Sequence, residues 1–66
     1  MAELGEELRR ERVRRNLTFK DVEQVLHIKT TYLEAIEDGN YAVIPGRVYA
    51  KGFIRNYGNY LGLDGD

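Results

Sequence analysis

Cysteine is absent from this chain of 66 residues, and histidine and proline occur once each. Without thiols, no disulfide or thiolate metal site can add stability, so packed apolar side chains must hold the fold together. His27 has no cysteine or second histidine to join it, which argues against a zinc site. The chain also lacks an apolar run of about 18 residues and a signal-peptide pattern, so we expect it to be soluble and suited to a reducing compartment. Its length predicts one small domain, residues 1–66.

Acidic and basic residues nearly balance: 10 Lys and Arg stand against 11 Asp and Glu, for a formal net charge of −1. The net charge of the whole molecule therefore does not favour binding to nucleic acid or to anionic lipid. Residues 9–20 are the exception, because they contain five arginines and one lysine but a single acid, Glu11. The arginines could contact phosphates, although glutamates interleave with them and favour a solvated helix surface. They are Arg9, Arg10, Arg12, Arg14 and Arg15.

No arrangement of residues in the sequence indicates catalysis. The neighbouring carboxylates Glu6-Glu7 and Glu37-Asp38 point in different directions on helices, and so small a domain cannot enclose a substrate between them. Residues 46–52, G-R-V-Y-A-K-G, lack the G-K-[ST] ending of a phosphate-binding loop. We therefore predict that the chain is not an enzyme and needs no cofactor.

The spacing of apolar residues predicts an all-α fold, a small domain of four to five helices. A first helix is expected over residues 3–15, with Leu4 and Leu8 on a thin apolar stripe. Thr18 and Asp21 have the spacing of a capping box and predict the start of a second helix. The apolar positions of this second helix are Phe19, Val22, Val25 and Leu26.

Residues 18–39 are expected to form the centre of the fold, a helix-turn-helix motif of two short helices joined by a tight turn. The third helix starts at Lys29 or Thr30 and ends at Asp38, before Gly39. Its inward residues are expected to be Tyr32, Leu33 and Ile36. The segment resembles the helix-turn-helix family typified by phage repressors, including the family's closing E-x-G. The apolar positions of that family hold Val22, Leu26, Ile28, Leu33 and Ile36.

Two residues of the motif depart from the family pattern. Glu23 stands where a small residue between the two helices is preferred, and is expected to tilt the helices apart or to lie at their edge. His27 stands where glycine is preferred in the turn, which predicts a non-glycine residue in the left-handed region.

DNA binding is one functional hypothesis for this motif, as a transcription regulator with residues 9–15 on phosphates. In such proteins the first residues of the second helix of the motif reach base edges in the major groove, and here these are Lys29, Thr30 and Thr31. Only Lys29 has a strong donor for direct readout. Residues 28–38 also carry one lysine against three carboxylates, whereas duplex DNA attracts mainly Lys and Arg. The charge of this face therefore argues against the function that its fold indicates.

A last helix is expected within residues 45–62, started by Pro45 and ended by Gly62. Gly52 is its weak point, where the helix could split in two. At about 100° per residue, the helix has two apolar stripes roughly a quarter-turn apart. The first, of the kind that faces a core, consists of Ala50, Ile54, Tyr57 and Leu61, and the second of Tyr49, Phe53 and Tyr60.

The second stripe has two interpretations, since a small domain needs one apolar face of a helix for its own core. Either other helices cover it, or Tyr49 and Phe53, with Lys51 and Arg55 nearby, form an aromatic and basic patch for a protein partner. Tyr57 lies on the first stripe and is expected to be structural.

The sequence is similar to the cytoplasmic domain of the RodZ family of bacterial cell-shape proteins over essentially its whole length. The specific motif is P-G at residues 45–46, Tyr49, K-G-F-I-R at residues 51–55, Tyr57, and L-G-L at residues 61–63. The resemblance implies a protein-interaction module that binds the bacterial actin MreB and links the actin cytoskeleton to the membrane, in maintenance of the rod shape.

In this family the actin-contacting aromatics lie one turn apart in the last helical region, which carries over to Tyr49 and Phe53. Lys51 and Arg55 are implied as rim charges that tune the rate of association. Family members continue through a linker and one transmembrane helix, which these 66 residues do not include. Location at the cytoplasmic face of the bacterial inner membrane is therefore implied by the family alone.

Overall fold

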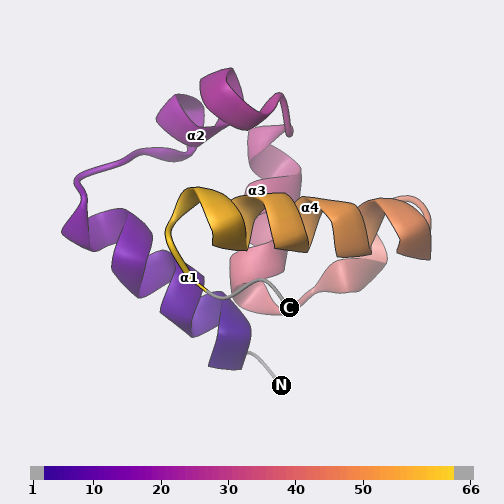
Figure 1. The fold of residues 1–66 in the computed structure, drawn as a ribbon. Helices are drawn as coiled ribbons and strands as arrows, with labels where there is room; N and C mark the ends of the chain where they lie inside the picture. Colours follow the sequence, from indigo (N-terminus) through magenta and orange to yellow (C-terminus); the bar gives the residue numbers. More distant parts are fainter. Residues whose placement is uncertain (1–2, 64–66) are drawn as a thin grey trace.

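The structure is a computed structural model that describes residues 3–63, and within them it is all-helical (Figure 1). Its elements are α1 (Glu3–Arg14), α2 (Phe19–Leu26), α3 (Thr30–Asp38), the short 3-10 helix η1 (Tyr41–Val43) and α4 (Arg47–Tyr60). The predicted all-α class is confirmed, with α2 and α3 as the two helices of the motif. None of the helices described is long and apolar enough to cross a membrane.

Each α-helix is followed by a residue with positive φ, which turns the chain sharply away from the helix axis. These residues are Asn16 and His27, both with φ 58°, Gly39 with φ 75° and Gly62 with φ 79°. After α4, the N–H of Leu63 donates to the carbonyl of Gly58 at 2.8 Å, which pairs one of the last carbonyls of the helix. The left-handed conformation expected for His27 is confirmed.

Of the two helix starts predicted from capping residues, one is confirmed and one is wrong. Thr18 and Asp21 form the expected capping box before α2, with 2.9 Å from the Thr18 N–H to Oδ2 and 3.1 Å from the Asp21 N–H to Oγ1. α4 begins at Arg47, so Pro45 precedes the helix instead of opening it. The expectation of a split at Gly52 is wrong, because α4 runs through this residue as one helix.

α3 is the central helix: α1, α2 and η1 pack against it, and α4 crosses in front of it in Figure 1. Tyr57 and Leu61 are fully buried, which confirms the first stripe of α4 as core-facing. Val25 is among the apolar positions expected to share one face of the second helix, but it is 54% exposed, because the eight-residue α2 buries only a narrow face around Val22. The buried apolar core comprises Leu8, Val22, Ile28, Leu33, Ala35, Ile36, Ile44, Tyr57 and Leu61.

α1 comes close to the backbone of α3 at Gly5, where there is no room for a side chain. A Cβ at this position would lie 2.2 Å from the carbonyl oxygen of Glu37 and 2.7 Å from that of Ile36. These distances are far inside van der Waals contact, so the close packing of the two backbones requires glycine here.

A buried polar cluster joins α1, α3 and α4. Glu37 is 6% exposed and accepts hydrogen bonds from Arg12, at 2.7 Å from Nε and 3.2 Å from Nη2, and from the hydroxyl of Tyr57. Arg12 also donates to the carbonyl of Leu17 at 2.9 Å and lies 4.1 Å above the ring of Phe19. Burial and the hydrogen bond to Glu37 raise the pKa of Tyr57, so its hydroxyl stays protonated and keeps donating. The interpretation of Arg12 as a solvated side chain is therefore wrong.

Candidate functional site

Three aromatic rings form a continuous row across two helices, and we call it the aromatic row: Tyr49 and Phe53 of α4 and Tyr32 of α3. The ring centroids of Tyr49 and Phe53 lie 6.2 Å apart with 32° between the planes, and those of Phe53 and Tyr32 lie 5.9 Å apart at 19°. Tyr49 is 63% exposed, whereas Phe53 and Tyr32 are half-buried against the core. The second stripe of α4 is thus partly covered by α3 and partly open to solvent.

Contacts at both ends of α4 fix the place of Tyr49. Gly46 precedes the helix with φ 87°, and a Cβ there would lie 3.1 Å from Cδ2 of Tyr49, so the ring packs closely beside this glycine. At the other end, Nη2 of Arg15 donates to the carbonyl of Leu61 at 2.8 Å. With Tyr57 buried between these ends, α4 is held against the domain while the Tyr49 ring stays outside.

Lys51 and Arg55 are exposed, but they do not lie beside the two α4 rings. In a continuous helix at about 100° per residue, Lys51 lies about 160° around the axis from Phe53, and Arg55 about 120° from Tyr49. Exposed charges placed in this way contribute to the electrostatic field around the domain and make no contact next to the rings.

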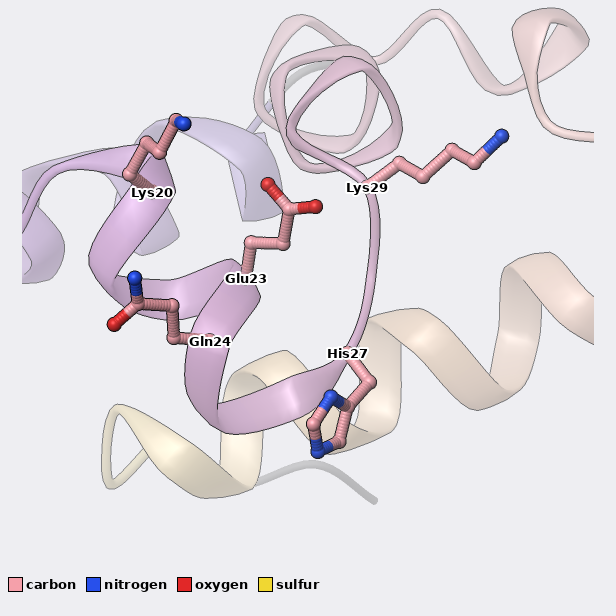
Figure 2. Close-up of a pocket in the computed structure, with 5 residues that line it drawn as sticks. All are labelled: Lys20, Glu23, Gln24, His27 and Lys29. Carbon is pink, nitrogen blue, oxygen red and sulfur yellow. The ribbon is translucent and has the colours of Figure 1, made fainter.

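The helix-turn-helix motif carries a hollow between α2 and the start of α3 (Figure 2). Its lining residues are Lys20, Glu23, Gln24, His27 and Lys29. Glu23 is half-buried in this lining, which agrees with the expectation that it lies at the edge of the two helices. Figure 2 shows Lys29 extended away from the α2 side chains. Among the residues expected to read DNA, Lys29 and Thr31 are exposed and Thr30 is half-buried.

Two of the three carboxylates of α3 lie on the surface of the helix. Glu37 is paired with Arg12 in the interior, but Glu34 and Asp38 are exposed and line a further hollow together with Arg9 of α1. A phosphate backbone laid along α3 would therefore meet two carboxylates, which oppose its charge.

Three of the five arginines considered for phosphate contacts have acceptors inside the domain. Arg12 binds Glu37, and both Arg14 and Arg15 bind Glu11. Nε of Arg15 lies 3.1 Å from Oε1 of Glu11. The hydrogen bonds from Arg14 and then Arg15 lower the pKa of Glu11 to about 2, so this acid stays ionised. Two carboxylates of the protein, Glu11 and Glu37, therefore offset part of the positive charge of the basic segment and hold three of its arginines in internal contacts.

Comparison with known proteins shows which family the chain belongs to. The family described as "Helix-turn-helix domain" matches residues 7–66. The chain is also 40% identical over 50 residues to the "Uncharacterized membrane protein YmfM" of Bacillus subtilis (strain 168). That match covers 76% of this chain and 17% of YmfM, so the chain spans a small part of the relative's length. No solved structure matches. On the match and on the arrangement of α2 and α3, the chain belongs to the helix-turn-helix domain family.

Proposed function

We propose that this domain is a protein-interaction module of the RodZ type that binds the bacterial actin MreB through Tyr49 and Phe53. The observation that carries the proposal is the 63% exposure of the Tyr49 ring, 6.2 Å from the ring of Phe53, on a helix whose other apolar stripe packs against the core. Aromatic residues dominate the energetics of protein interfaces, and a ring exposed to water gains most from being covered. The sequence motif around these two residues supports the same partner by resemblance.

Attachment to the membrane is part of this proposal. The relative YmfM is a membrane protein by its name, and the RodZ resemblance implies a linker and a transmembrane helix joined to this domain. A domain tethered in this way lies at the cytoplasmic face of the inner membrane and links actin filaments to it. Lys51 and Arg55 then act as charges that steer the approach to the filament.

A DNA-binding regulator is the alternative, with Lys29, Thr30 and Thr31 on the bases. Membership of the helix-turn-helix family supports it. The exposed acids of α3 and the internal pairing of the arginines oppose it, because DNA affinity comes mainly from Lys and Arg on phosphates. Its signature would be binding that falls steeply with salt and depends on Lys29.

Titration of the domain with purified MreB, beside a random DNA duplex at physiological salt, tests the proposal. We expect saturable binding to MreB and little binding to the duplex. Tyr49→Ala should weaken MreB binding about tenfold or more, as loss of an aromatic hot spot does, without changing the melting temperature. Val48→Ala is the matched control, because Val48 is 82% exposed and lies next to Tyr49 but on another face of α4.

The double variant Tyr49→Ala, Phe53→Ala should abolish MreB binding and keep its helical circular dichroism. If the double variant is unfolded, the two rings belong to the core and the interface assignment loses its basis. A wild-type domain that ignores MreB but binds the duplex through Lys29 would move the function to the helix-turn-helix motif.

A further inference from the structure

Tyr32 connects the proposed interface on α4 to the helix-turn-helix motif. Its ring stacks on Phe53 at 5.9 Å, and none of the side-chain hydrogen bonds among the described residues involves its hydroxyl, which is not buried without a partner. We propose that the partner's footprint extends from α4 onto α3, with the Tyr32 ring in direct contact and its hydroxyl donating a hydrogen bond to the partner. This inference rests on the proposed function and adds a residue and a second helix to its interface.

The order of the rings in the aromatic row supports the extension. Phe53 lies between Tyr49 and Tyr32, with centroids 6.2 Å and 5.9 Å from them, and it is the more buried neighbour of exposed Tyr49. A partner that reaches the exposed edge of Phe53 must therefore lie over the rings on both sides of it. The contact area then includes the first turn of α3, where Tyr32 is the third residue.

The chemistry of the row describes the surface that fits it. The row has a phenolic hydroxyl at each end and a purely apolar ring in the middle, so the complementary surface is an apolar strip with a hydrogen-bond acceptor at each end. An acyl chain offers no acceptor to the hydroxyls, and a bare phosphate offers no apolar cover to the middle ring, so the row suits a folded protein surface better than either.

The charge next to Tyr32 specifies the acceptor at that end of the row. Lys29 lies one turn before Tyr32, is exposed, and extends away from α2 in Figure 2. The acids Glu34 and Asp38 lie about 160° and 120° around α3 from Tyr32, beside Arg9, and so face another side. Glu23 lines the same hollow as Lys29, but Lys29 extends away from it in Figure 2 and carries its charge outward. An acidic side chain of the partner is therefore expected beside Tyr32.

The test compares Tyr32→Phe with the wild-type domain in a titration against purified MreB. Tyr32→Phe keeps the ring and its stack on Phe53, so a residue that only positions Phe53 would be insensitive to it. Direct contact predicts a loss of about threefold or more in affinity with an unchanged melting temperature. Tyr60→Phe, two turns beyond Phe53 on α4 and also half-buried, is the matched control and should stay within about twofold.

A labelling experiment maps the footprint directly, because the chain has no cysteine of its own. Saturating MreB should slow maleimide labelling of Tyr32→Cys and leave Glu7→Cys, exposed on α1, unaffected. Equal affinity of Tyr32→Phe and wild type, or equal labelling of Tyr32→Cys with and without MreB, overturns the inference. If Tyr49→Ala still weakens binding in that case, the proposed function stands. A wild-type domain that does not bind MreB overturns both.

Discussion

Arg12 and Glu37 lie 25 residues apart in the chain and meet in a buried ion pair, with Nε 2.7 Å from Oε2 and Nη2 3.2 Å from Oε1. Two parallel hydrogen bonds between a guanidinium and a carboxylate fix both the distance and the relative plane of the two groups. Because Tyr57 donates to the same carboxylate, the pair also sets where α4 lies against α1 and α3. The position of the proposed interface therefore depends on an acid that is itself buried.

Glu37→Ala should lower the free energy of unfolding by about 3–5 kcal/mol, because it leaves Arg12 as a buried charge without its partner. This is a large share of the roughly 3–10 kcal/mol expected for a domain of this size. Urea unfolding followed by circular dichroism measures the loss. Glu34→Ala is the control on the same helix: Glu34 is exposed, and its loss should change stability by about 0.5 kcal/mol or less. Similar losses in the two variants would show that the buried ion pair contributes no more to the free energy of unfolding than an exposed glutamate does.

Gly5→Ala and Gly52→Ala should have opposite effects on stability. Alanine at position 5 places Cβ 2.2 Å from the carbonyl oxygen of Glu37, so α1 must move and about 1–3 kcal/mol or more is lost. Alanine at position 52 meets nothing within 4 Å inside α4 and should gain about 0.5–1 kcal/mol of helix stability. Thermal melts of both variants measure the effects. A melting temperature of Gly5→Ala at or above that of the wild type would contradict the packing at Gly5, and a lowered one for Gly52→Ala would contradict the open position in α4.

His27→Gly should raise stability by up to about 1 kcal/mol. His27 has φ 58°, a conformation that costs a non-glycine residue about 1–2 kcal/mol, and part of the gain is offset by the freedom that glycine adds to the unfolded chain. Asn16→Gly, at the same φ, should gain less, because asparagine tolerates this conformation better. Denaturant unfolding separates the two, and a destabilised His27→Gly would mean that the imidazole makes a stabilising contact.

Acid should weaken the domain partly through Glu11. Its pKa falls from 4.5 to about 2 on folding because Arg14 and Arg15 donate to it, so the folded state holds this carboxylate ionised more strongly than the unfolded chain does. The stabilising contribution is complete above pH 4.5 and is lost as the pH falls toward 2. The stability difference between wild type and Glu11→Gln should shrink over this range, and NMR titration of the carboxyl carbon locates the pKa. A midpoint near the ordinary value would contradict the pairing.

Features that depend on neighbouring residues could be predicted from the sequence. The capping box of Thr18 and Asp21, the left-handed His27 and the turn at Gly62 each close within a few residues, so residue type and spacing are sufficient. The same holds for the inward stripe of α4 at Tyr57 and Leu61, which follows from the period of the helix.

Contacts between helices could not be predicted in the same way. Glu37 lies on the inward side of α3, one residue after Ile36, and an acid in that position needs a partner, but five arginines precede it and nothing in the spacing selects Arg12. Tyr32 was expected to face inward, and it does so only in part. A helical period gives the direction of a side chain and not the identity of the ring that it meets, so its stack on Phe53 was missed.

On the proposed function, the stack of Tyr32 on Phe53 would make binding to a filament and binding to DNA compete for the same copies of this domain. The start of α3 and the middle of α4 are parts of one face, so a protein seated across both rings also covers the neighbourhood of Lys29 and Thr31, which a duplex would need. Occupancy by filament and by chromosome would then be mutually exclusive. Copies bound along a filament could not bind DNA. The number of copies free to bind DNA would therefore rise as the number of occupied filament sites falls.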